Sequence, residues 1–293
     1  MRAAAPSTSP GPAPSTSCSS CTTASVPPSH ACGRRPDVGG PRVVALGDSV
    51  TEGLGDSVPE GYVPGWAGHL AVLLAGPPAV VLASRGAQVE EVARVQLPVA
   101  TSIDAEVATL LVGGNDIIRL GLDVDALAAS VRDICETLAR SYQVVVVVLL
   151  HDPATTLPTW LPDLAAVMSW RAQRLNAAIA SATDDLELVL VVDPTALGDL
   201  SSRALWHVDR MHPSPAGHRM LAQVVADLLD ERGFASPGAM TPYVRAEASR
   251  LDEARWAVRT GVPWLLRRAL NLIPEMAAVV ITERRQAAAA RRG

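Results

Sequence analysis

Five short apolar runs rich in valine, leucine and alanine recur along the middle of the chain, and helical patterns separate them. The runs, which we expect to be strands, span residues 42–47, 79–83, 105–113, 143–150 and 186–193. The helical stretches span residues 66–74, 88–95, 124–140, 164–182 and 215–232. Strands that are apolar along almost their whole length are typical of parallel sheets with helices on both faces. Because crossovers between parallel strands are right-handed, the pattern predicts an α/β fold, a three-layer α/β/α sandwich around a five-stranded parallel sheet.

Two segments of different composition flank the expected domain, which spans residues 41–236. Residues 1–40 are rich in Pro, Ser, Thr, Ala and Gly, so we expect a disordered, low-complexity arm. The arm contains Cys18, Cys21, His30 and Cys32, but their spacing is irregular and no folded module surrounds them, so we expect no metal site. Cys135, on an expected helix, is predicted to be a buried apolar residue.

Residues 237–293 are expected to form a helical, basic and amphipathic C-terminal extension. Residues 255–293 contain eight arginines and two glutamates, whereas the whole chain has a net charge of −5. Such helices pack on their own enzyme or on a second subunit, or lie on an anionic membrane surface, and we favour docking on protein. We see no transmembrane run and no signal peptide, so we expect a cytoplasmic protein. The oligomeric state stays open.

The end of the first expected strand carries a potential nucleophile. Gly47, Asp48 and Ser49 follow the apolar run directly, and the carboxyl ends of strands in open α/β sheets are where ligands bind. Far downstream, Asp209 precedes His212 by three residues, so its carboxylate can accept a hydrogen bond from the imidazole. The other ring nitrogen is then free to take a proton from a serine. These residue types predict nucleophilic catalysis.

Two further strand ends offer hydrogen-bond donors. Asn115 follows two glycines at the end of the third run, and its amide is an uncharged donor suited to a developing oxyanion. Gly86 follows the second run and presents an unobstructed backbone N–H. We expect both residues to lie at the same edge of the sheet as Ser49.

In this order, the motifs resemble the GDSL esterase/lipase family, also called SGNH hydrolases: Gly47-Asp48-Ser49, Gly113-Gly114-Asn115-Asp116 and Asp209-Arg210-Met211-His212. The resemblance implies a flavodoxin-like strand order of 2-1-3-4-5. It also implies that Ser49 is the nucleophile, His212 the general base and Asp209 its orienting partner.

The same resemblance implies an oxyanion hole made by the backbone N–H groups of Ser49 and Gly86 and the side-chain amide of Asn115. Asp48 and Asp116 are then supporting residues that hold loops by accepting backbone hydrogen bonds. Neither is expected to transfer a proton.

Loops around this edge have two interpretations. The segment 151–163, which begins with His151, is expected either to line an acyl pocket or to cover the sheet edge. Trp206 and His207 are candidates for shaping the leaving-group side, whereas His218, on the last helix of the domain, is expected to be structural.

We therefore expect a serine esterase or lipase-type hydrolase that cleaves carboxylic esters through an acyl-enzyme and needs no metal or organic cofactor. The alternative is an acyltransferase on the same scaffold that passes an acyl group to a sugar or lipid hydroxyl. A binding protein without activity is a further alternative. We expect a small-molecule or lipid ester as the substrate and no nucleic-acid partner. The low aromatic content favours aliphatic acyl groups over sugars.

Overall fold

The central sheet has five parallel strands in the order β2-β1-β3-β4-β5, which confirms the predicted fold and the strand order that the resemblance implies. The computed structural model describes residues 39–58, 60–157, 160–207, 209–239, 258 and 272–290. The expected disordered arm with its cysteines, and the part of the C-terminal extension between residues 240 and 271, therefore lie almost wholly outside the described residues. The strands are β1 (Val43–Gly47), β2 (Val80–Val81), β3 (Val107–Leu111), β4 (Val144–Val148) and β5 (Val189–Val192).

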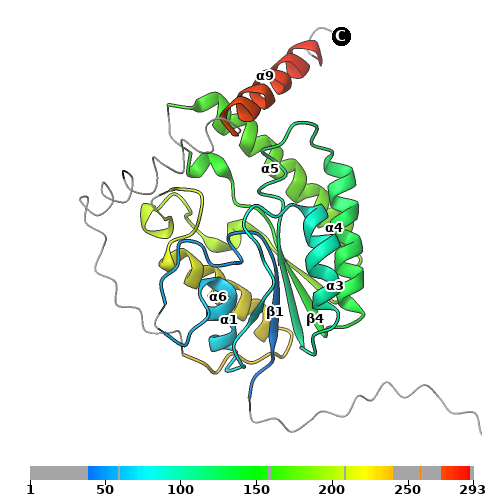
Figure 1. Ribbon diagram of the computed structural model, residues 1–293, viewed down its shortest axis with the longest axis vertical. Helices are drawn as coiled ribbons and strands as arrows, with labels where there is room; N and C mark the ends of the chain where they lie inside the picture. Colours follow the sequence, from blue (N-terminus) through cyan, green and yellow to red (C-terminus); the bar gives the residue numbers. More distant parts are fainter. Residues whose placement is uncertain are drawn as a thin grey trace, which may run out of the picture. The chain divides into compact units, whose positions relative to one another are not determined.

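Helices cover both faces of the sheet (Figure 1). One layer contains α1 (Gly65–Leu73) and α6 (Pro215–Asp230), which pack against each other. The other contains α2 (Val89–Glu91), the π-helix η1 (Val92–Gln96), α3 (Leu97–Ala100), α4 (Val124–Ala139) and α5 (Pro162–Thr183). Three 3-10 turns, η2 (Pro153–Thr155), η3 (Pro194–Leu197) and η4 (Arg203–Leu205), lie in the loops after β4 and β5. The last helix described is α9 (Leu272–Ala290).

Alternating strand residues supply the two halves of the core, because successive side chains of a strand point to opposite faces. In β1, Val43 and Ala45 pack in the layer of α1 and α6, whereas Val44 and Leu46 pack with the helices between α2 and α5. The strands are buried on both faces, which is why they read as continuous apolar runs. Cys135 is fully buried, as predicted.

Two element boundaries differ from the sequence prediction. The helix predicted to end at residue 95 continues through η1 and α3 to Ala100 and includes Pro98. The second strand is shorter than predicted and spans two residues. Its hydrogen bonds to β1 nevertheless continue to Ser84, whose N–H donates to the Gly47 carbonyl at 3.2 Å.

A buried polar cluster fastens the loop after β1 to α1 and α6. His218 Nδ1 accepts a hydrogen bond from the Trp66 N–H at 3.2 Å. Since a backbone N–H can only donate, the ring proton lies on Nε2, which donates to the Leu54 carbonyl at 3.1 Å. The nearby Asp56 carboxylate pairs with His69 Nε2 at 2.9 Å. Burial lowers the pKa of His218 to about 4, so this ring is neutral at pH 7.

Among the residues that the structure describes, every helix is too short or too polar to cross a bilayer.

We expect the free energy of unfolding to fall as the pH is lowered from 7 to 4. Unfolded His218 takes up a proton near its ordinary pKa of 6.5, whereas the folded residue does so near 4. The unfolded state therefore binds more protons in this window, which corresponds to up to about 3 kcal/mol. Urea unfolding at several pH values measures the slope. His218→Asn should be less stable at pH 7 and show a shallower pH dependence, and equal slopes in both proteins would contradict the assignment.

Candidate active site

A cavity of about 230 Å³ opens at the carboxyl edge of the sheet. Its walls come from the ends of β1, β3 and β4 and from the loop that precedes α6. Parallel strands bring these ends to one edge, so residues remote in sequence become neighbours there. Ser49, Asn115 and His212 all line this cavity.

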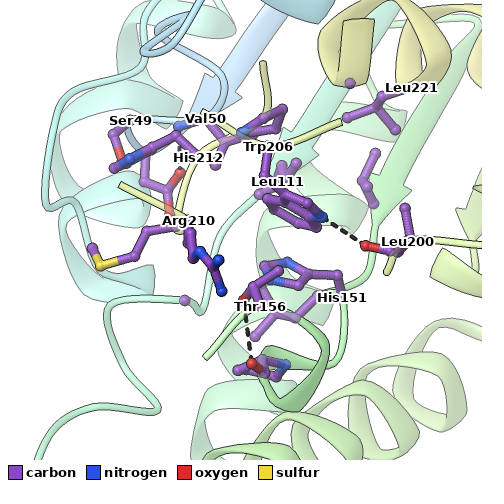
Figure 2. A pocket seen from close by; sticks show the side chains of 18 of the residues that line it. Ser49, Val50, Leu111, His151, Thr156, Leu200, Trp206, Arg210, His212 and Leu221 are labelled. Atoms are coloured by element: carbon purple, nitrogen blue, oxygen red, sulfur yellow. Dashed lines mark hydrogen bonds between the residues drawn. The ribbon is translucent and has the colours of Figure 1, made fainter. Parts of the chain in front are cut away.

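Three of the predicted residues form a continuous hydrogen-bonded chain. Ser49 Oγ lies 2.8 Å from His212 Nε2, and His212 Nδ1 lies 2.8 Å from Asp209 Oδ2. The Asp209 carboxylate places the ring proton on Nδ1, since an ionised carboxylate only accepts. Nε2 is therefore the basic nitrogen and faces the serine hydroxyl. Figure 2 shows Ser49 and His212 together at one side of the cavity.

Asp209 holds two histidines. His207 Nδ1 lies 3.1 Å from the same Oδ2 that contacts His212, while Oδ1 accepts the N–H groups of Met211 and His212 at 2.9 and 3.1 Å. Burial by itself would raise the pKa of Asp209, but the hydrogen bonds from His207, His212 and the Met211 N–H hold it well below its usual range. The carboxylate is thus ionised at neutral pH.

The backbone ahead of Ser49 is held by a side chain that the sequence analysis missed. Gln96 is buried, and its amide pairs with both polar groups of Gly47: Gly47 N–H donates to Oε1 at 2.8 Å and Nε2 donates to the carbonyl at 2.9 Å. Gln96 lies on the π-helix η1, and such irregular turns are frequent at functional sites. Gly47 has φ +149°, and a Cβ there would lie 2.2 Å from the Leu111 carbonyl, so this position requires glycine. A π-turn is not visible as a sequence pattern, which is why Gln96 was not predicted.

The three expected oxyanion donors differ in whether they already donate a hydrogen bond within the protein. In the described part of the chain, neither the Ser49 N–H nor the Gly86 N–H donates to another group. Gly86 has φ +82° and open space beside its Cα, but it does not line the cavity itself. The Asn115 amide does line it, yet its Nδ2 donates to Asp48 Oδ2 at 3.2 Å and to the Ala87 carbonyl at 3.0 Å.

Asp48 and Asp116 are buried carboxyl groups that accept backbone hydrogen bonds. Asp48 Oδ1 accepts the Val50 N–H at 3.0 Å, and Asp116 accepts the Val89 N–H at 3.3 Å. Burial raises the pKa of Asp48 to about 6, although the Val50 N–H opposes this shift, and burial also raises the pKa of Asp116. The two residues connect the turn after β1 to Asn115 and to the start of α2.

The opposite walls of the cavity are apolar or neutral. His151 packs on Trp206 with ring centroids 4.4 Å apart, and burial lowers the pKa of His151 to about 4, so it is uncharged at pH 7. Trp206 is anchored by a hydrogen bond from Nε1 to the Leu200 carbonyl, drawn in Figure 2. The loop after β4 contributes Leu157 to the lining, whereas Trp160 of the same loop is 76 % exposed. The loop thus lines the cavity, which was one of its two expected roles.

Comparisons with known proteins concern the family and the fold of the chain. The sequence model of the family described as GDSL-like Lipase/Acylhydrolase matches residues 45–220. The structure is similar to that of Axe2, an acetylxylan esterase from Geobacillus stearothermophilus, with 20 % identity, coverage of 68 % of this chain and 98 % of that chain, and a TM-score of 0.51. A catalytic mutant of Axe2 gives 19 % identity, coverage of 64 % and 94 %, and a TM-score of 0.52. At this identity the structural likeness concerns the fold. No curated protein matches the sequence.

We expect Gln96→Leu to lower both stability and turnover. The substitution leaves the buried Gly47 N–H without an acceptor, which costs about 1–3 kcal/mol, and it frees the backbone that positions Ser49. Urea unfolding and esterase assays measure the two effects. Gln173→Leu, at an exposed position on α5, is the matched control. Equal stabilities for the two variants would show that the Gly47 pairing is dispensable.

Proposed function

Because the chain belongs to the GDSL-like lipase/acylhydrolase family and is a carboxylic ester hydrolase, we propose that it acts through an acyl-enzyme formed on Ser49. The observation that carries this proposal is the chain of two 2.8 Å contacts from Ser49 Oγ through His212 to Asp209. A serine hydroxyl is a weak nucleophile until an adjacent base takes its proton, and His212 Nε2 lies where that base is needed.

The proposed reaction has two halves. In the first, Ser49 Oγ attacks the ester carbonyl while His212 Nε2 takes the hydroxyl proton, and the ionised Asp209 stabilises the imidazolium. The tetrahedral intermediate then breaks its bond to the alcohol, which leaves with the proton from His212. In the second half, His212 removes a proton from water, the hydroxide attacks the acyl-enzyme, and the proton returns to Ser49 as the acid departs.

The negative charge on the intermediate needs donors close to Ser49. The free N–H groups of Ser49 and Gly86 support their proposed role, since neither has a competing acceptor within the described chain. Asn115 is the third proposed donor and has to turn one amide hydrogen from Asp48 or the Ala87 carbonyl toward the substrate. One such donor is typically worth about 3 kcal/mol of the activation barrier.

The lining of the cavity favours an aliphatic acyl group. Its apolar members include Leu111, Ile117, Ile118, Leu157 and Met168. Apolar walls stabilise an alkyl chain and give a polysaccharide few partners for its hydroxyl groups. We propose that the substrate is a small-molecule or lipid ester with an aliphatic acyl chain.

Ser49→Ala should abolish labelling by a fluorophosphonate probe, because the probe reacts with the activated serine hydroxyl. Gel fluorescence measures the labelling. Ser130→Ala is the control, because Ser130 donates its hydroxyl hydrogen to the Ala126 carbonyl within α4 and has no contact with the cavity. Labelling that persists in Ser49→Ala would identify a different nucleophile.

Asp209→Asn should reduce kcat by about 10⁴, because an amide at this position favours the wrong tautomer of His212. The KM should change much less, since Asp209 does not line the cavity. Steady-state hydrolysis of nitrophenyl esters gives both constants. Asp199→Asn, an exposed acid outside the cavity, should retain full activity. An Asp209→Asn enzyme with normal kcat would remove this residue from the mechanism.

A further inference from the structure

The helix α9 lies beyond the part of the chain that matches the family, yet it packs on the catalytic domain. Its residue Val279 is fully buried. Two ion pairs also contact it: Arg119 with Glu275 of its first turn at 2.7 Å, and the more exposed pair of Asp163 with Arg284 at 2.7 Å. Within the described part of the C-terminal extension, α9 thus packs on the same chain, and the segment between residues 240 and 271 lies almost wholly outside the described residues.

The most buried of the described ion pairs of α9 joins it to α5. Arg171 of α5 is 3 % exposed in its side chain and donates from Nε and Nη2 to Glu283 Oε1 at 2.9 and 2.6 Å, where the glutamate side chain is 15 % exposed. Among the described residues, Glu283 is the only acid paired with Arg171. A buried guanidinium without a counter-charge is costly, so this pair couples the docking of α9 to the packing of α5.

The same arginine ties α9 to the turn that carries Asn115. Arg171 Nη1 donates to the carbonyls of Ile117 and Arg119 at 2.8 and 2.7 Å, and Arg119 in turn pairs with Glu275. The side chain of Ile117 lines the cavity. One network of charges thus joins α9, α5 and the wall of the site.

Within this network, α9 also contributes a side chain to the cavity. Met276 follows Glu275 and lines the same cavity as Ser49, together with Ile117, Ile118 and Met168. Methionine is flexible and apolar, and it fills irregular space next to alkyl chains.

We propose that α9 is a built-in wall of the acyl pocket and that Met276 determines which acyl chains fit. This inference rests on the proposed function, since it assigns a substrate property to that same site. The ion pairs of Glu275 and Glu283 hold Met276 in place, and the size of its side chain sets the space left for the alkyl chain. Specificity then comes from a segment that the family match does not include.

The test compares kcat/KM for nitrophenyl decanoate and nitrophenyl acetate in wild type, Met276→Ala and Met276→Trp. Removing or adding groups of this size in an apolar pocket changes discrimination by about tenfold or more. The ratio of decanoate to acetate should rise about tenfold in Met276→Ala and fall about tenfold in Met276→Trp. Met276→Leu, of similar volume, and Ile281→Ala, on the same helix but 50 % exposed, should keep the wild-type ratio.

A ratio that stays constant in Met276→Ala and Met276→Trp, while Ser49-dependent hydrolysis persists, would overturn the inference and leave the proposed function intact. A second measurement does not require catalysis. In a Ser49→Ala background, calorimetry with decanoate should give a Kd about tenfold weaker for Met276→Trp than for Met276→Leu. Equal Kd values would overturn the inference. Different Kd values with no Ser49-dependent hydrolysis would instead support the inference and overturn the proposed function.

Discussion

The hydrogen bond between Ser49 Oγ and His212 Nε2 joins residues 163 positions apart. It exists because β1, between β2 and β3, ends at Gly47 at the carboxyl edge of the parallel sheet, while the loop before α6 returns to the same edge. Only Gly47 allows the close approach of β1 to the Leu111 carbonyl at this edge. The cavity opens beside the contact between Ser49 and His212, since both residues line it.

Buried polar groups hold the backbone on both sides of Ser49 in place. Gln96 pairs with the Gly47 backbone on one side of the serine, and Asp48 binds the Val50 N–H on the other. Further along the same loop, the Leu54 carbonyl accepts a hydrogen bond from His218, a buried residue of α6. Each of these groups is satisfied within the protein, which is the condition under which buried polar residues rigidify a site.

The C-terminal helix extends this principle beyond the family's common region. Arg171 is buried beneath α9 and shares its donors between Glu283 and two carbonyls of the turn that follows Asn115. Such an arrangement couples the position of α9 to the position of the turn. An enzyme with a widely used sheet and site can therefore acquire its own pocket shape from an added helix, without any change in the residues proposed for catalysis.

The sequence by itself determined the layers, because apolar runs with the periodicity of strands and helices can be recognised locally. Its motifs at the strand ends gave the residues around which the site is built, and their family resemblance gave the strand order. It missed Gln96 because a π-turn has no periodic signature, and although it favoured docking of the C-terminal extension on protein, it did not say which surface α9 would cover. Only the tertiary structure decided these points. The partners of Gln96 and Glu283 lie 49 and 112 positions away, and such pairings depend on packed geometry rather than on neighbouring residues.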